Sequence, residues 1–277
     1  MLNGNGTQAQ AEEILDAAIG LAQQKWRDRL IAAYALGSLA HGGFRPLVSD
    51  IDIGFVLEDP LLASDAEGIG SVVSTVEASR KPFSDRLSVF WGSVASLSGT
   101  SSGGRFPPLD RLDLLKFGRL VIGRDVRAKL SFPTREQLVV AGAEFARWRL
   151  DRDDVIAKLN DPVALLRSDP KTLTKLILYP VRFLFTARTG DVGRNDAAVE
   201  HFVAAGMSPS SELARLALEW RKASPADSDS AAIRAIATGL FPLYREFLRD
   251  HEARLRAYGR LDLADAFLEW QQRLDAC

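Results

Sequence analysis

The apolar positions of the first 130 residues change repeatedly between a helical period and short continuous runs. One set follows the helical period: Ala11, Ile14, Leu15, Ala18, Ala22 and Trp26. Similar spacing predicts helices over 61–80 and 109–118. Runs rich in β-branched and aromatic residues predict four strands, at 29–37, 49–59, 86–93 and 119–123. A Ser-, Gly- and Pro-rich stretch, 93–108, predicts a mobile loop. The alternation indicates an α/β or α+β sheet domain over residues 1–130.

From Thr134 onward the apolar residues follow only helical spacing. Six amphipathic stretches are expected there, at 135–150, 171–187, 195–206, 211–223, 231–255 and 263–274. Pro180 is expected to kink or break its helix, because proline lacks the amide proton that the helix needs. Residues 131–277 are therefore predicted to form an α-helical bundle domain.

Composition narrows the function classes. The chain has 35 Lys and Arg residues and 36 Asp and Glu residues, which gives a net charge of -1. This balance does not favour binding to nucleic acid or to an anionic membrane over a large basic surface. The single cysteine, Cys277, cannot build a disulfide framework or a thiolate zinc site within one chain. No signal-peptide pattern and no bilayer-length apolar run is present, so a cytoplasmic protein with no membrane partner is expected.

Two acidic residues stand on the second predicted strand, within the stretch LGSLAHGGFRPLVSDIDIGFVLED at 36–59. Asp50 and Asp52 are two residues apart, so their side chains leave the same face of a strand, while Ile51 and Ile53 point the other way into a core. Two carboxylates this close repel each other, and a divalent cation would relieve the repulsion. Oxygen ligands of this kind suit Mg²⁺, which proteins commonly hold through carboxylates and substrate phosphates.

The residues before this strand suit a phosphate. Gly37 and Ser38 directly follow the first strand, where a small residue lets backbone amides approach a phosphate and the hydroxyl adds a donor. The pair at 42–43, both glycine, lets the chain turn back, and Arg45 adds a positive charge. Metal, carboxylates and phosphate contacts together indicate phosphoryl or nucleotidyl transfer.

These residues resemble a known family. GSLAHGGFRPLVSDIDI is similar to the signature of the nucleotidyltransferase superfamily, which has the DNA polymerase beta-like fold: GS, a glycine-containing spacer, then D-x-D. The motif GG-F-R-P-SDID most resembles that of the bacterial aminoglycoside adenylyltransferases, although the spacer is one residue longer in this chain. TARTGDVGRNDAA, at 186–198, resembles their nucleotide-facing turn more loosely. The resemblance implies a nucleotidyltransferase-type mixed-sheet domain followed by an all-α bundle.

The resemblance also implies roles for individual residues. Asp50 and Asp52 would ligate Mg²⁺ and act in catalysis. Five residues would contact the nucleoside triphosphate, expected to be ATP: Gly37, Ser38, Arg45, Ser49 and Arg194. His41 lies inside the same loop, either as a phosphate contact or as an ordinary loop side chain.

The superfamily needs a third carboxylate on the next strand. The matching position reads Leu87-Ser88-Val89, where the adenylyltransferases have Leu-Glu-Val, and a serine cannot act as a carboxylate base. Asp85 is nearby, but in a regular strand its side chain would point to the opposite face. It is the expected third catalytic acid if the strand has a bulge or a shifted start. Asp110 and Asp113, on the following predicted helix, are further options.

The expected function is metal-dependent transfer of a nucleoside monophosphate, AMP from ATP, to a hydroxyl of a small molecule such as an aminoglycoside. Two alternatives remain open: a catalytically impaired nucleotide-binding or regulatory relative, and a toxin–antitoxin type enzyme that modifies a protein. Asp151, Asp153 and Asp154, beside Trp148, would suit a polycationic acceptor if they face the site, or form a solvated helix end if they do not.

Overall fold

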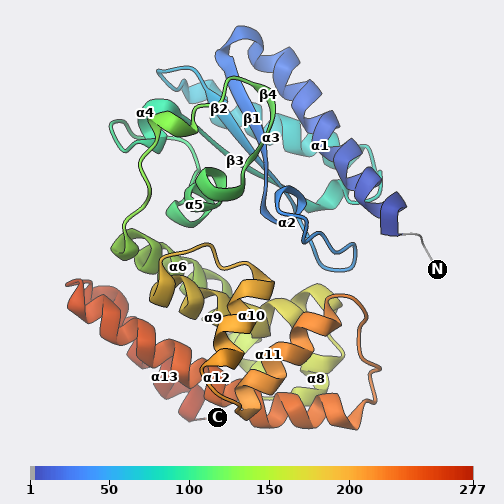
Figure 1. Cartoon of the computed structure of the whole chain (residues 1–277), viewed down its shortest axis with the longest axis vertical. Coiled ribbons are helices and arrows are strands. Elements are labelled where there is room, and N and C mark those ends of the chain that lie inside the picture. Colours follow the sequence, from blue (N-terminus) through green and yellow to red (C-terminus); the bar gives the residue numbers. More distant parts are fainter. Residues whose placement is uncertain (1–3, 277) are drawn as a thin grey trace. The chain divides into compact units, whose positions relative to one another are not determined.

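The computed structural model describes residues 4–276, and the chain divides into two compact units, the first ending at Pro133 and the second beginning at Thr134 (Figure 1). The elements of the first unit are α1 (Gly4–Trp26), β1 (Leu30–Leu36), α2 (Gly37–Ala40), β2 (Ile51–Leu57), α3 (Ala63–Ala78), β3 (Leu87–Ser93), α4 (Val94–Leu97), α5 (Pro108–Phe117) and β4 (Arg119–Gly123). Three-residue 3-10 turns lie at Arg27–Arg29, Ser84–Arg86 and Arg127–Lys129. The four strands lie where the sequence pattern predicts them.

The strands form one mixed sheet in the order β3-β2-β1-β4. β1 pairs antiparallel with both β2 and β4, and β2 pairs parallel with β3. The parallel pair is joined through helix α3, as a parallel connection requires. Two pairings position the site: Asp52 lies opposite Leu36 on β1 and beside Ser88 on β3.

The sheet is buried on both faces. On one face α1 and α3 pack against alternate residues of β2, of which Ile51, Ile53 and Phe55 are fully buried, as predicted. On the other face Leu36 belongs to the same cluster as Leu114 of α5. Residues opposite each other on paired strands share a face, so Asp52, opposite Leu36, is on the α5 side of the sheet.

The segment 93–108 is more ordered than the loop expected from its composition. Ser93 caps the short helix α4 by accepting the amide of Ser96 at 3.2 Å. Farther on, Trp91 and Arg105 exchange two backbone hydrogen bonds, of 2.9 and 2.8 Å, along the outer edge of β3. Gly104 makes this approach possible, because it has a φ of +82° and a Cβ there would lie 2.6 Å from the carbonyl oxygen of Trp91.

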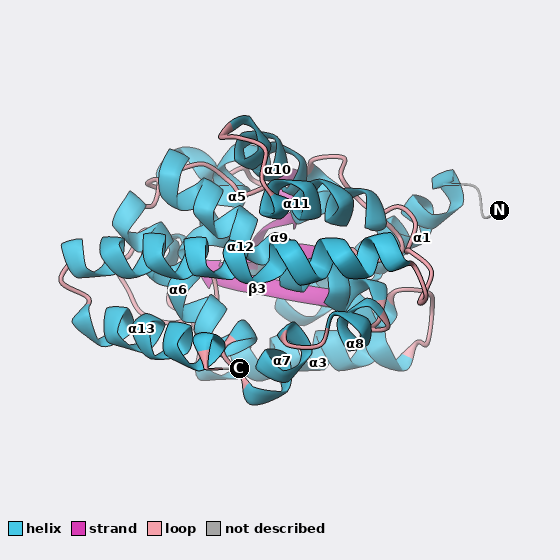
Figure 2. Ribbon diagram, turned by 90° about the horizontal axis from the view of Figure 1, so that it is seen from below, coloured by secondary structure: helices cyan, strands magenta, loops and turns pink. Residues whose placement is uncertain are grey.

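The second unit is entirely helical over its described residues (Figure 2). Its helices are α6 (Arg135–Leu150), α7 (Asp153–Leu159), α8 (Pro162–Leu166), α9 (Pro170–Thr189), α10 (Asn195–Ala204), α11 (Pro209–Trp220), α12 (Ser230–Ala257) and α13 (Leu261–Asp275). α7 and α8 are not predicted from the sequence, because helices this short show too few turns of apolar spacing. Nowhere in residues 4–276 does a helix have the length and apolar character to cross a membrane.

Helix α9 continues through Pro180, which was expected to kink or break it. The helix extends without interruption from Pro170 to Thr189. Pro180 is buried, and its neighbours Leu178 and Val181 are 2% and 0% exposed. Burying side chains of this size contributes about 1.5–3 kcal/mol each, comparable to the cost of about 3 kcal/mol for an interior proline. Packing of this segment therefore outweighs the lost backbone hydrogen bond.

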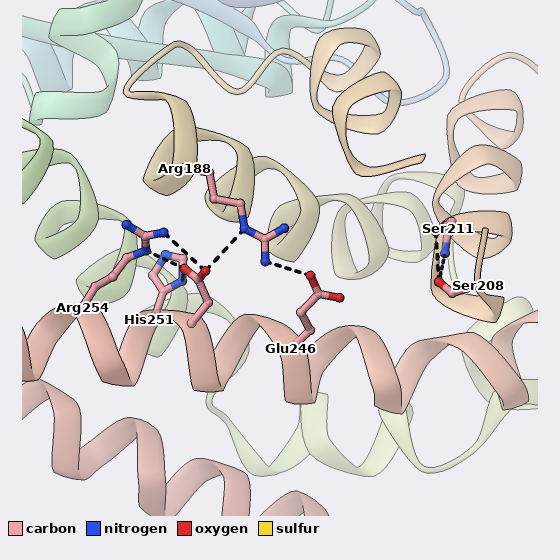
Figure 3. Close-up of polar contacts among 7 residues, drawn as sticks. Arg188, Ser208, Ser211, Glu246, His251 and Arg254 are labelled. Carbon is pink, nitrogen blue, oxygen red and sulfur yellow. Dashed lines mark hydrogen bonds and ion pairs between the residues drawn. The ribbon is translucent and has the colours of Figure 1, made fainter. Parts of the chain in front are cut away.

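A charged network joins α9 to α12 (Figure 3). Arg188 of α9 reaches Glu246 at 2.8 Å and Asp250 at 3.4 Å, and Arg254 pairs with Asp250 at 2.7 Å. His251 lies next to this network but is buried, with 1% of its surface exposed, and burial lowers its pKa to about 4 although neighbouring Asp250 favours the charged form.

This histidine makes the stability of the chain depend on pH. The unfolded chain, whose histidine has a pKa near 6.5, binds more protons than the folded chain between that pH and about 4. Stability is therefore expected to fall by about 3 kcal/mol as pH is lowered through this window. His251→Phe should flatten the dependence, measured as the urea midpoint by circular dichroism. An unchanged slope in the variant would contradict the assignment.

Asp250 does not titrate in the same window. Burial raises the pKa of its carboxyl. The hydrogen bond from Arg254 and the charges of His251, Arg254 and Arg188 lower the pKa by a larger amount, so the pKa is below its usual value. Its contribution to stability is lost only as pH falls below the range in which His251 acts, so the two effects can be separated.

Candidate functional site

The corner between β1 and α2 is built around Gly37. This residue has a φ of +56°, in the left-handed region that glycine alone enters without strain. A Cβ at this position would lie 2.3 Å from Oδ2 of Asp52, the strand residue opposite Leu36. The carboxylate of Asp52 therefore packs directly against the backbone of Gly37, which explains why the chain has no side chain here.

A second carboxylate contacts the same glycine. Oδ2 of Asp113, on α5, accepts the amide proton of Gly37 at 2.6 Å, and its Oδ1 lies 3.8 Å from Nε2 of His41. Both side chains are largely enclosed, with 12% of Asp113 and 15% of His41 exposed. His41 also meets the ring of Phe117 edge-on, with centroids 5.6 Å apart. Asp52, Asp113 and His41 therefore surround one backbone corner.

The sequence contains a signal for Asp113. Its neighbours Leu112 and Leu114 are 2% and 0% exposed, and Asp113 itself is buried. An acid between two buried leucines is unusual, because a carboxylate is rarely buried unless it has a partner or a function. From the sequence, Asp113 is only one option for the third acid, because nothing in the spacing of residues shows that α5 packs near the end of β1.

Asp50 lies one residue before β2 and, like Asp52, is partly exposed. The two residues therefore lie at the same end of β2, Asp50 just before the strand and Asp52 at its second position. Ser88 is beside Asp52 in the parallel ladder and on the same face. The place next to Asp52 that the resemblance assigns to a carboxylate therefore holds a hydroxyl.

The structure places Asp85 away from this ladder. It lies on the exposed 3-10 turn Ser84–Arg86, before β3 begins at Leu87. Within the described part of the chain, Asp85 makes no hydrogen bond or ion pair with the residues of the Gly37 corner. The bulge or shifted strand start that Asp85 would need is absent, because Ile51 to Leu57 pair with Leu87 to Ser93 without a break.

Arg45 and Ser49 belong to one tight turn. The hydroxyl of Ser49 accepts the amide proton of Arg45 at 2.9 Å, and the Ser49 amide donates to the carbonyl of Arg45 at 2.8 Å. Ser49 is 4% exposed, so its hydroxyl stabilises the turn that delivers the two aspartates. The guanidinium of Arg86, on the 3-10 turn before β3, donates to the carbonyl of Pro46 at 2.5 Å and so contacts the same turn.

Arg194 lies in the helical unit, directly before α10. Its guanidinium pairs with Asp196 at 3.5 Å, and the preceding Gly193 accepts a hydrogen bond of 2.5 Å from Arg182. The turn named by the looser part of the resemblance is therefore anchored to α9. Contact of Arg194 with a nucleotide stays a prediction.

The donor atoms at the Gly37 corner suit a hard cation. The carboxylate oxygens of Asp52, at this corner, and of Asp50, two residues before it, are ligands that Mg²⁺ prefers, and neither residue is a thiolate. Across residues 4–276, no three or more His, Cys, Asp or Glu side chains are arranged to hold a metal ion on their own. This donor set fits a Mg²⁺ ion that is shared with the phosphates of a substrate, in the manner usual for this ion.

Comparison with known proteins identifies the fold. No family model matches the sequence, and no curated protein matches it. Among solved structures, the chain is similar to the spectinomycin adenyltransferase AAD(9) from Enterococcus faecialis, determined with ATP and spectinomycin. The TM-score is 0.55 at 15% sequence identity, over 81% of this chain and 97% of that chain. The expected fold, a nucleotidyltransferase-type mixed-sheet domain followed by a helical one, is confirmed.

Proposed function

We propose that the chain is a metal-dependent nucleotidyltransferase that transfers AMP from ATP to a hydroxyl of a small molecule. The observation that carries the proposal is the pair of carboxylates, Asp52 and Asp113, that contact the backbone of Gly37 from two different elements. The shared fold supports it, because the similar adenyltransferase was determined with ATP.

Each residue has a role in this reaction. Asp50 and Asp52 would hold Mg²⁺, which neutralises the charge of the triphosphate. Ser38, next to Gly37, would donate its hydroxyl and amide protons to phosphate oxygens. The acceptor oxygen forms a bond to the α-phosphorus, the bond from that phosphorus to the bridging oxygen breaks, and pyrophosphate leaves. The proton of the acceptor hydroxyl goes to a carboxylate.

Asp113 is the carboxylate proposed to receive that proton. Ser88 cannot do so, and Asp113 lies on the same face of the sheet as Asp52. The amide of Gly37 donates to Oδ2 of Asp113 and holds this carboxylate in place for the role of a base. His41 can then take the proton on to solvent. The third acid of this chain comes from a helix rather than from β3.

Nucleotide binding tests the proposal directly. ATP, CTP, GTP and UTP are each added with and without Mg²⁺ while thermal unfolding is followed. A nucleotide at about a hundred times its Kd stabilises the folded state by ~2.7 kcal/mol. Asp52→Asn should abolish the Mg²⁺-dependent part of the shift, whereas Asp16→Asn, an exposed acid on α1, should leave it unchanged. A full Mg²⁺-dependent shift in Asp52→Asn would refute the proposed site.

One observation favours a second candidate, a nucleotide-binding protein without transferase activity. The amide of Gly37 is already donated to Asp113, so a phosphate reaches that amide only if Asp113 moves. Beside Asp52 the chain has Ser88, whose hydroxyl cannot replace the carboxylate of an active transferase. Stabilisation by a nucleotide and Mg²⁺, with no pyrophosphate release for any acceptor, would favour this candidate over the enzyme.

A further inference from the structure

The helical unit contains a small pocket with a strongly basic lining. The pocket has a volume of about 140 Å³ and is formed by the end of α6, by α7 and by α9. Its lining is Arg149, Leu150, Arg152, Asp154, Val155, Lys158, Thr172, Lys175, Leu176 and Tyr179. The lining therefore has four basic side chains and one acidic side chain. At about 30 Å³ per water molecule, this space holds roughly five waters, room for the anionic group of a ligand.

The acidic residues near the pocket are already neutralised. Asp154, in the lining, pairs with Arg152 at 2.9 Å. Asp151 and Asp153 both pair with Arg273 of α13, the second at 3.2 Å. The acids that could have attracted a polycationic acceptor are thus engaged by arginines, which does not favour an aminoglycoside at this place.

Two of the basic residues are not neutralised in this way. Neither Arg149 nor Lys158 has an ion-pair partner among the residues that the structure describes. Arg149 is exposed and Lys158 is half-buried, so both can turn toward a ligand. Like charges around one hollow raise its potential and attract an anion, which makes charge-assisted hydrogen bonds with them.

An aromatic wall fixes the third cation. The ammonium of Lys175 lies over the ring of Tyr179, 5.9 Å from its centroid. Tyr179 is itself stacked on Phe183 at 5.8 Å and meets Phe145 edge-on at 5.4 Å. The tyrosine is therefore held in place, and it lines the pocket beside the cations.

We propose that this pocket binds a small hydroxyl compound that carries a phosphate or carboxylate group, with Arg149, Lys158 and Lys175 holding the anionic group and Tyr179 contacting the carbon skeleton. The binding site itself does not depend on the nucleotide site, because all of its residues lie in the helical unit. The assignment of the bound compound as the nucleotide acceptor rests on the proposed function. The acceptor class is then acidic rather than polycationic.

Isothermal titration of the full chain tests the pocket. The probes are glucose 6-phosphate, citrate, uncharged glucose and spectinomycin. We expect glucose 6-phosphate or citrate to bind, and the affinity to fall as salt is added. Comparison of the two dissociation constants shows whether the pocket prefers a phosphate or a carboxylate. Arg149→Ala combined with Lys158→Ala should weaken binding at least about 10-fold, the effect of losing roughly 1.4 kcal/mol. Arg234→Ala, an exposed arginine of α12, should not change it.

Three results would contradict the proposed anion site. They are no binding of either anion, equal affinity of the double variant and the parent for the anion, or tighter binding of spectinomycin or glucose than of the anions. Asp52→Asn separates this proposal from the function. Anion binding that persists in Asp52→Asn but is lost in the double variant supports the pocket, whatever the nucleotide experiment gives. If pyrophosphate release from ATP is stimulated by spectinomycin and not by the bound anion, the acceptor assignment is wrong even though the pocket stands.

Discussion

Asp113→Asn is expected to lower the rate of pyrophosphate release by about 10²–10⁴-fold, the usual loss when a general base is removed. The substitution leaves the fold in place, because the amide oxygen of asparagine can still accept the proton of Gly37. Stabilisation by nucleotide and Mg²⁺ should persist, since Asp50 and Asp52 are untouched. Steady-state rates and thermal shifts on one preparation measure both effects.

Asp85→Asn distinguishes the two candidate bases. Asp85 lies on an exposed turn, so its replacement should leave the rate within about 2-fold of the parent, a change of roughly 0.4 kcal/mol in the barrier. A large loss in Asp85→Asn with little loss in Asp113→Asn would restore the strand-based assignment. Ser88→Glu, in the Asp113→Asn background, places a carboxylate beside Asp52 and should recover part of the rate.

Gly37→Ala is expected to disable the site by a different route. Its Cβ would overlap Oδ2 of Asp52 at 2.3 Å, and its φ of +56° costs an alanine about 1–2 kcal/mol. The carboxylate of Asp52 must therefore move away, and the nucleotide-dependent and Mg²⁺-dependent thermal shift should be lost together with activity.

Gly42→Ala is the matched control for this variant. Gly42 also has a positive φ, of +77°, but a Cβ there meets no atom within 4 Å. The two variants share the strain of a positive φ, so Gly42→Ala should also lose some stability, while only Gly37→Ala loses the ligand response. If Gly42→Ala lost that response equally, the effect would come from loop strain and not from Asp52.

The local part of the fold could be predicted from the sequence because it depends on periodicity. The strand 51–57 follows from a run rich in β-branched and aromatic residues, and the burial of Ile51 and Ile53 on one face follows from the period of two. These features require only neighbours along the chain, and a single sequence contains that information.

The remainder depends on contacts between distant residues. Asp113 meets Gly37 across 76 positions, and Arg273 reaches Asp153 across 120. No local pattern states that α5 packs on the Asp52 face or that α13 neutralises the acids after α6. The sequence therefore left Asp113 as one option among three, and left the charge of the α6–α7 region open.

The strand β3 stands at one end of the sheet, where unpaired backbone groups can recruit a strand from another molecule. The two hydrogen bonds between Trp91 and Arg105 occupy the middle of that exposed border with the chain's own backbone. Gly104 permits the contact, so the segment that returns toward α5 also guards the sheet against edge-to-edge association. We therefore expect Gly104, which lies outside the Gly37 corner, to limit aggregation at high concentration.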